Sequence, residues 1–266
     1  MILPGTYANG FAPRDGRPLY ESLWKGCVGA WNPGLGVSGL TLRDASGFNR
    51  HGVLTNGATW AASQGKYALD FDGTDDCLQC GTQINASLLG EITVAGSFKF
   101  RNRSTVNAPL SNLSSGGATG LALEIGRTAN KLSWLQNGAS VDATSTGTIT
   151  DANIHHVAVV RTGSTGAWTI TFYIDGISSS HSTAANPSAA SLNGQFTIAR
   201  YGDYTGGFNA NMQATDLMVF SRALSPQEIR TLASRRGIAY EMAPRRRSSV
   251  QVTTNRRRRI IIGGNR

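Results

Sequence analysis

Apolar and polar side chains alternate one by one along several short stretches of this chain. Ile92, Val94, Phe98 and Phe100 alternate with polar or small side chains, and residues 168–175 repeat the pattern. A period of two residues places the apolar side chains on one face of a β-strand. The sequence therefore predicts half-buried antiparallel strands. Further stretches of this kind are 121–125, 131–135, 156–161, 195–200 and 214–220.

Dipeptides that favour tight turns lie between or beside the predicted strands. Asn-Gly and Asp-Gly pairs adopt the positive φ angles that two-residue hairpin loops require. Such pairs occur at Asn56-Gly57, Asp72-Gly73, Asn137-Gly138, Asp175-Gly176 and Asn193-Gly194. Their number favours a fold of short strands joined by turns.

One helix is predicted, over residues 225–236. Ser225 can cap its first turn, Pro226 suits the first helical position, and Glu228 completes a capping box. Gly237 follows the apolar face of this segment as a stop signal.

The chain divides into three predicted parts. Residues 1–22 contain three prolines and three glycines, which predicts an extended arm. Residues 23–237 carry the strand and helix patterns of a single domain, and residues 238–266 form a basic tail. An apolar content of 40% in 266 residues is enough to bury a core. Only 15% of the residues are charged and 32 are glycine, which favours a β-sandwich over a helical bundle.

The positive charge of the chain is concentrated at one end. Residues 245–266 contain eight arginines and no acidic residue, out of 25 basic residues in all. The remaining 17 basic and 16 acidic residues nearly cancel, so the net charge of +9 describes the tail and not the domain. The three cysteines have no zinc-site spacing and are expected to be reduced and buried.

Several motifs follow one another in a fixed order. They are D-x-S-G-x-x-x-H-G within residues 31–52, L-D-F-D-G-T-D-D within 68–76, H-H-V-A-V-V at 155–160, F-Y-I-D-G at 172–176, I-A-R-Y-G at 198–202, and the closing strand and helix within 208–236. Together they resemble the laminin-G-like, concanavalin A-like jelly-roll family, with Ile154 in place of a usual Trp and Thr215-Asp216 in place of Asp-Glu. The resemblance implies an all-β jelly-roll sandwich of two antiparallel sheets over residues 23–237, with about a dozen strands and one short C-terminal helix.

Asp70, Asp72, Asp75 and Asp76 form the densest acidic cluster. Some relatives in the family hold Ca²⁺ with oxygens from this region, so Asp72, Asp75 and Asp76 are candidate ligands. The favoured alternative is structural: Asp70 faces outward beside Phe71, and Asp72-Gly73 forms a turn stabilised by the Asp72 side chain. No cofactor is otherwise expected.

Catalysis is not expected. The β-glucanases that share this fold place two glutamates in a Glu-x-Asp-x-x-Glu spacing on one strand. The glutamates of this chain stand singly, at Glu21, Glu91, Glu124, Glu228 and Glu241. His155 and His156 are adjacent in a predicted strand and therefore point to opposite faces, one at the edge of the core and one on the surface.

Two segments are candidates for binding. Tyr201, Tyr204 and Phe208 lie in a glycine-rich loop, where they either contact a sugar or cap the core. The second candidate is the tail, whose arginines could pair with an acidic particle surface or, less favourably, with nucleic acid. The candidate anchoring residues are Arg245, Arg246, Arg247, Arg256, Arg257, Arg258 and Arg259.

The basic C-terminus resembles those of phage-type members of the family. This resemblance implies a non-enzymatic structural or binding module on a virion, either a capsid decoration or a tail-associated protein, with other virion proteins as partners. The alternative is a lectin-like carbohydrate-binding module, with its dependence on calcium left open, and host-surface glycans are its candidate ligands. Self-association is left open. No secretory signal and no stretch of about 18 apolar residues is seen, so a soluble virion protein is expected.

Overall fold

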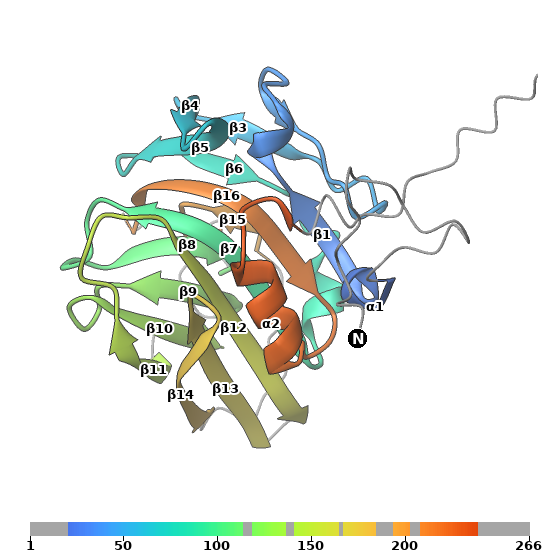
Figure 1. Ribbon diagram of the computed structural model, residues 1–266, viewed down its shortest axis with the longest axis vertical. Helices are drawn as coiled ribbons and strands as arrows, with labels where there is room; N and C mark the ends of the chain where they lie inside the picture. Colours follow the sequence, from blue (N-terminus) through green and yellow to red (C-terminus); the bar gives the residue numbers. More distant parts are fainter. Residues whose placement is uncertain are drawn as a thin grey trace, which may run out of the picture.

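The computed structural model describes residues 21–113, 119–136, 141–164, 167–184, 194–202 and 208–238. Their strands form two sheets of eight, and every pair of neighbouring strands is antiparallel (Figure 1). The predicted sandwich of two antiparallel sheets is therefore confirmed.

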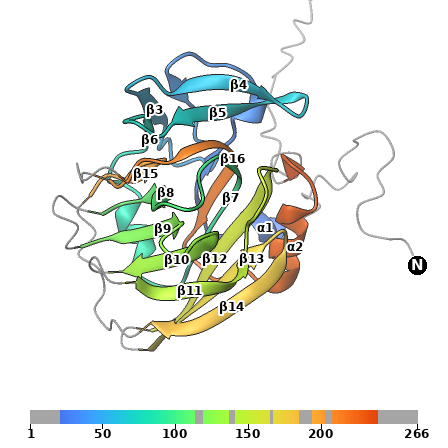
Figure 2. The same ribbon diagram turned by 90° about the vertical axis from the view of Figure 1, so that its left-hand side faces the viewer.

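Sheet A runs in the order β14 (Ile177–Ala184), β13 (Ala167–Ile174), β12 (His155–Ser164), β7 (Ile92–Phe100), β16 (Asn211–Phe220), β5 (Lys66–Asp72) and β4 (Thr59–Ser63), with β1 (Cys27–Trp31) also paired to β16. Sheet B runs in the order β11 (Val141–Thr148), β10 (Lys131–Gln136), β9 (Leu121–Ile125), β8 (Asn107–Ser111), β15 (Thr197–Ile198), β6 (Cys77–Gln79), β3 (Gly52–Thr55) and β2 (Thr41–Leu42). The edge strands β11 and β14 lie side by side, which closes one flank of the sandwich (Figure 2).

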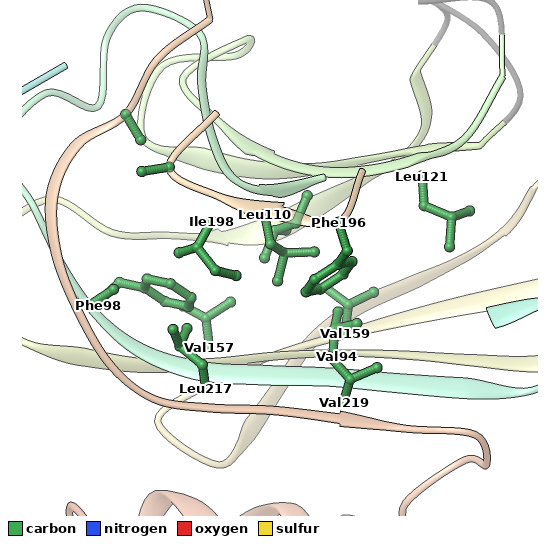
Figure 3. Packing of buried hydrophobic residues seen from close by; sticks show 14 of the residues in the cluster. Val94, Phe98, Leu110, Leu121, Val157, Val159, Phe196, Ile198, Leu217 and Val219 are labelled. Carbon is green, nitrogen blue, oxygen red and sulfur yellow. The ribbon is translucent and has the colours of Figure 1, made fainter. Parts of the chain in front are cut away.

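The core fills the space between the sheets. Phe98, Val157 and Leu217 of sheet A point toward Leu110 and Ile198 of sheet B (Figure 3). All five are at most 3% exposed. The alternation seen in the sequence produces this arrangement because every second side chain of a strand faces the same layer.

Helix α2 (Pro226–Ala233) covers the outer face of sheet A (Figure 1). Ser225 and Glu228 form both hydrogen bonds of the predicted capping box. Ile229 and Leu232 are buried in a second apolar cluster between the helix and the sheet. The helix is held both by its cap and by an apolar face, as the sequence predicted.

The ends of this helix differ from the prediction of 225–236. Ser225 is the N-cap, outside the first turn, and the helix ends at Ala233 with Ser234 as C-cap. The Ser234 amide bonds to the Thr231 carbonyl, which tightens the last turn, and Gly237 follows with φ 78°. The α-helical period of 3.6 residues therefore stops at residue 233. The prediction extended this period to residue 236.

The expected extended arm of residues 1–22 is corrected at its end. Residues 21 and 22 begin the short helix α1 (Glu21–Trp24), and residues 1–20 lie outside the described residues. Leu23 is buried in the cluster beneath α2, and this burial holds the single helical turn α1 in place. The proline-rich composition of the segment gave no sign of this turn.

Sixteen strands are present in the described part of the chain, more than the dozen expected. The predicted strand at 195–200 shortens to the two residues of β15, and β2 and β6 have two and three residues. Strands this short contain no full alternation, so a pattern of period two cannot reveal them. Two 3-10 helices, η2 (Pro33–Leu35) and η3 (Asn85–Leu88), were likewise missed.

The described turns agree with the sequence pattern. Asn56 and Gly57 have φ angles of 60° and 110°, and Asp175 and Gly176 have 52° and 78°. Asn137-Gly138 and Asn193 lie outside the described residues. The three cysteines are free and buried, as expected. In the ranges that the structure describes, no helix has the length and apolar character to cross a membrane.

Candidate functional site

The turn between β5 and β6 is built by its own aspartates. Asp72 accepts a hydrogen bond from the Thr74 amide at 2.7 Å, and Asp76 accepts one from the Asp72 amide at 2.9 Å. Asn56 donates from its side chain to the Asp75 carbonyl at 3.1 Å. The predicted turn, stabilised by the Asp72 side chain, is confirmed.

The same turn brings three carboxylates together. Asp72, Asp75 and Asp76 each offer an oxygen within 4.8 Å of the others. Asp76 is only 5% exposed. Burial and the charges of Asp72 and Asp75 raise the pKa of the Asp76 carboxyl, against the hydrogen bond from the Asp72 amide. A cation would relieve this repulsion, but three carboxylates are fewer than the six to eight oxygens that Ca²⁺ takes in proteins. Calcium binding here stays a prediction.

Asp70 does not belong to this group. Its carboxylate lies 2.6 Å from the Arg101 guanidinium and accepts a hydrogen bond from Gln213 at 3.3 Å. Burial raises the pKa of Asp70, but the bonds from Arg101 and Gln213 outweigh it and hold the pKa below its ordinary value. Asp70 is thus a partner of Arg101 on the outer side of sheet A.

A hollow of about 400 Å³ adjoins the aspartate turn. We call it the rim hollow. Its polar lining comes from the end of β5, the loop after β7 and the residues around the start of β16. The residues relevant to binding are Asp72, Asn102, Asn107, Phe208, Asn209 and Asn211.

Hydrogen bonds fix the amides of the rim hollow. Asn209 donates to the Thr74 carbonyl and so ties β16 to the aspartate turn. Asn107 donates to the Asn102 carbonyl at 3.2 Å and accepts from the Asn211 amide at 3.3 Å. These bonds join three distant segments of the chain into one wall.

Tyr201 and Phe208 have different roles. Tyr201 is 4% exposed and packs on Ala108 and Leu135 on the outer face of sheet B. Of the two roles that the sequence left open for this residue, the burial of its ring favours the cap. Phe208 lies against Tyr201 with ring centroids 4.8 Å apart, is half-buried, and lines the rim hollow. Tyr204 lies outside the described residues.

The structure therefore unites two candidates that the sequence kept apart. Phe208 of the predicted ligand loop and Asp72 of the aspartate turn line the same hollow. Sequence reasoning missed the four asparagines, because asparagine is common in every loop. The only available signal was the spacing of Asn209 and Asn211, which are two residues apart where β16 begins.

Each glutamate side chain that the structure describes is engaged elsewhere. Glu124 in β9 is fully buried and is held by two bonds from Arg127, at 2.6 and 2.7 Å. Glu228 bonds Arg222 and the helix cap, and Glu91 accepts from the Gly163 amide. The arrangement offers no pair of glutamates for glycoside hydrolysis in the described part of the chain. The candidate anchoring arginines 245–247 and 256–259 lie beyond it.

A family model described as the concanavalin A-like lectin/glucanases superfamily matches residues 72–230. Among solved structures, Trypanosoma rangeli sialidase in complex with sialic acid is similar, with 17% identity and a TM-score of 0.60 over 79% of this chain and 33% of the sialidase. The binding domain of Paraclostridial Mosquitocidal Protein 1 has 13% identity and a TM-score of 0.60, over 79% of this chain and 52% of that one.

A structure named as a receptor binding domain has 14% identity and a TM-score of 0.61, over 81% of this chain and 52% of that one. Identities this low support a shared fold. The chain spans a third to a half of the length of these proteins. No curated protein matches the sequence.

Proposed function

Because the chain belongs to the concanavalin A-like lectin/glucanases superfamily, we propose that it is a non-enzymatic module that binds a glycan in the rim hollow. The observation that carries the proposal is the convergence of Phe208, side-chain amides and the carboxylate of Asp72 around one hollow. An aromatic ring packs against the apolar face of a sugar, while amides and carboxylates bond its hydroxyl groups. The volume of about 400 Å³ suits a small ligand.

The contacts of the glutamate side chains favour binding over hydrolysis. A glycosidase needs one carboxyl as acid and a second as nucleophile or base on either side of the bond. Glu124 is enclosed and paired with Arg127, so it offers neither role. Two structural neighbours are named as binding domains, which is consistent with a binding role. Their sequence identities are so low that the likeness itself shows only the fold.

Calcium enters the proposal as an accessory ion. Asp72, which lines the rim hollow, and its neighbours Asp75 and Asp76 would supply carboxylate ligands, and sugar hydroxyls or water would complete the coordination. On this proposal the glycan bridges the ion and Phe208. Removal of calcium then weakens binding without unfolding the domain, because the turn already holds itself by hydrogen bonds.

The test is a glycan array with the full chain, in calcium and in chelator, followed by calorimetry on the best ligand. Phe208→Ala should weaken binding about fivefold or more, since stacking on aromatic rings contributes on the order of 1 kcal/mol. Asp75→Asn should weaken glycan binding only when calcium is present. Glu91→Gln is the control and should bind as the parent does, because Glu91 is an exposed acid at the opposite end of β7 from the hollow.

Two results would overturn the proposal. One is the absence of any glycan ligand in both conditions. The other is binding that Phe208→Ala leaves unchanged, because the ligand then lies elsewhere. Binding that survives the chelator and Asp75→Asn removes calcium from the proposal and keeps the glycan.

The virion location is a second proposal with its own observation. The body is nearly neutral, whereas residues 245–266 contain eight arginines and no acid. Such a segment fits an acidic particle surface, where arginine pairs with carboxylates through two bonds. On this view the tail anchors the module to other capsid or tail proteins, and the rim hollow faces host glycans.

Particles assembled with the full chain and with a chain ending at residue 244 test the anchoring. Loss of the module from purified particles on truncation supports it, and full retention contradicts it. Replacing the seven arginines of the two runs by lysine is the matched control for charge. Replacing them by glutamine removes the charge at equal length and should release the module.

A further inference from the structure

A second hollow lies at the opposite end of β3 from the aspartate turn. Its volume is about 590 Å³, and we call it the basic hollow. β3 runs from Gly52, next to this hollow, to Thr55, whose hydroxyl bonds Cys77 directly after the aspartate turn. The two hollows are therefore separate sites. The side chains that matter here are Ser38, Thr41, Arg43, Asp44, Asn49 and His51.

Asp44 lines the basic hollow but has no free acceptor atom. One oxygen accepts from the amides of Ala30 and Ser46, at 2.9 and 2.8 Å. The other accepts from the Ser46 hydroxyl at 2.7 Å and the Arg50 amide at 3.0 Å. The residue is 7% exposed. Hydrogen bonds within and next to the D-x-S-G-x-x-x-H-G motif therefore occupy both oxygens of the Asp44 carboxylate. The side chains of the hollow that stay available to a ligand are mainly hydrogen-bond donors.

His51 presents such a donor. Its Nδ1 accepts a hydrogen bond from the Asp44 amide at 3.1 Å. A ring nitrogen that accepts carries no proton, so in the neutral ring the proton is on Nε2. The side chain is exposed, and Nε2–H is available to a ligand.

Arg43 adds a positive charge without an internal partner. The side chain is exposed and has neither a hydrogen bond nor an ion pair within the ranges that the structure describes. Free guanidinium groups of this kind bind carboxylates through two parallel hydrogen bonds. Arg43 and His51 line one hollow, so both can contact the same anionic group.

Phe48 is an exposed aromatic residue of the loop that lines the basic hollow. It stands between Gly47 and Asn49, which both line the hollow, and it is 56% exposed. The Arg50 guanidinium lies 4.6 Å from the ring centroid and holds the ring from one side. A half-covered aromatic ring beside polar groups is the arrangement that suits the apolar face of a sugar.

We infer that the basic hollow binds a carboxylate-bearing saccharide. The carboxylate pairs with Arg43 and with Nε2–H of His51, the sugar ring packs on Phe48, and Asn49 and Thr41 bond its hydroxyl groups. An anionic membrane is a poorer match, because lipid headgroups are attracted by clusters of about four to eight basic residues, and the hollow has one unpaired guanidinium. This site is independent of the rim hollow and of its glycan.

The experiment is calorimetric titration of the full chain with acidic oligosaccharides and a neutral counterpart. The probes are trigalacturonate, a hyaluronan tetrasaccharide and sialyllactose, with galactotriose as the neutral match for trigalacturonate. We expect at least one acidic probe to bind and galactotriose to bind at least about tenfold more weakly, because it lacks the charged group.

Arg43→Gln should weaken the acidic probe at least about tenfold, which corresponds to about 1.4 kcal/mol. Arg200→Gln makes the same chemical change at a half-buried arginine in another part of the fold and should have no effect. Phe48→Ala should also weaken binding, while Leu40→Ser, at an exposed apolar residue of the neighbouring loop, should not.

Several outcomes overturn the inference. They are the failure of all three acidic probes, equal loss from Arg43→Gln and Arg200→Gln, equal affinity for galactotriose, and binding of phosphatidylserine vesicles but no saccharide. A loss from Leu40→Ser as large as that from Arg43→Gln would assign the surface to a larger apolar partner and also overturn it. Phe208→Ala separates the two sites: if it alone abolishes acidic-sugar binding, the ligand occupies the rim hollow.

Discussion

His155 and His156 are consecutive residues of β12, yet their imidazole rings lie in opposite electrostatic environments. His155 bonds the carboxylates of Asp175 and Asp151, at 2.7 and 3.0 Å. His156 is 7% exposed and borders a cavity of water size with Asp216 and Leu232. The prediction that the two rings point to opposite faces agrees with this arrangement. The prediction that one of the two rings lies on the surface is wrong. His156 faces the outer side of sheet A, and α2 covers that side.

His156 should make the fold sensitive to acid. Burial lowers the pKa of His156 to about 4, although the Asp175 charge opposes the shift. The unfolded chain takes up this proton near pH 6.5 and the folded chain does not, so stability is present above pH 6.5 and is lost as the pH falls toward 4. Relative to His156→Leu, the parent should lose about 2 kcal/mol between pH 7.5 and pH 5.

Urea unfolding at pH 7.5, 6 and 5 measures this difference. Asp216, whose pKa burial raises to about 6 against the charge of Arg236, titrates in the same range with the opposite sign. Asp216 borders the same cavity as His156, so the parent and His156→Leu are also compared with Asp216 replaced by Asn in both, which isolates His156. Parallel stability curves for parent and variant would contradict the prediction.

His155 should make the folded state more stable at low pH than at high pH, the opposite of His156. Burial alone would lower its pKa, but the bonds to Asp175 and Asp151 outweigh this and raise the pKa of His155 above its ordinary value. Its stabilising contribution is therefore complete below pH 6.5 and is lost as the pH rises through the folded pKa. His155→Gln should lower the melting temperature more at pH 6 than at pH 8.5. A cost that is equal at both values would show that the imidazolium is not the stabilising form.

The Glu124–Arg127 pair should respond unequally to loss of either partner. Glu124 is fully buried, whereas a third of the Arg127 side chain reaches solvent. Arg127→Ala leaves a buried carboxylate without its cation and should cost about 3 kcal/mol of unfolding free energy. Glu124→Gln keeps an acceptor and leaves an arginine that can turn to water, so its cost should be about 1 kcal/mol.

Chemical denaturation of both variants tests this asymmetry. Arg101→Ala is the control, because the Arg101–Asp70 pair is more exposed and should contribute less than about 1 kcal/mol. Equal costs for the two Glu124–Arg127 variants would mean that desolvation of the carboxylate does not decide the stability of the pair.

The capping box of α2 should contribute a measurable part of the stability. The Ser225 hydroxyl accepts from the Glu228 amide, and the Glu228 carboxylate accepts from the Ser225 amide. Ser225→Ala should cost about 1 kcal/mol and Ser225→Gly only a few tenths. Thermal unfolding of the two variants side by side checks the order, and a glycine variant as unstable as the alanine variant would contradict it.

The predicted elements that held were those with a complete local pattern. Residues 121–125 were predicted as a strand and form β9 with the same bounds, because five alternating residues are enough to define an inner face. The cap at Ser225 held because a capping box involves only four consecutive residues. The predicted strand at 195–200 shrank to Thr197–Ile198, where pairing with β6 and β8 determines its length.

The candidate sites divide in the same way. The role of Asp72 in its own turn follows from neighbouring residues, and the sequence determined it together with the sandwich fold and the concentration of charge in the tail. Tyr201 as a cap and Phe208 beside Asp72 were decided by the tertiary structure. A turn or a cap is fixed by bonds between near neighbours, whereas the rim hollow exists only because segments distant in sequence lie together at the same end of the sandwich.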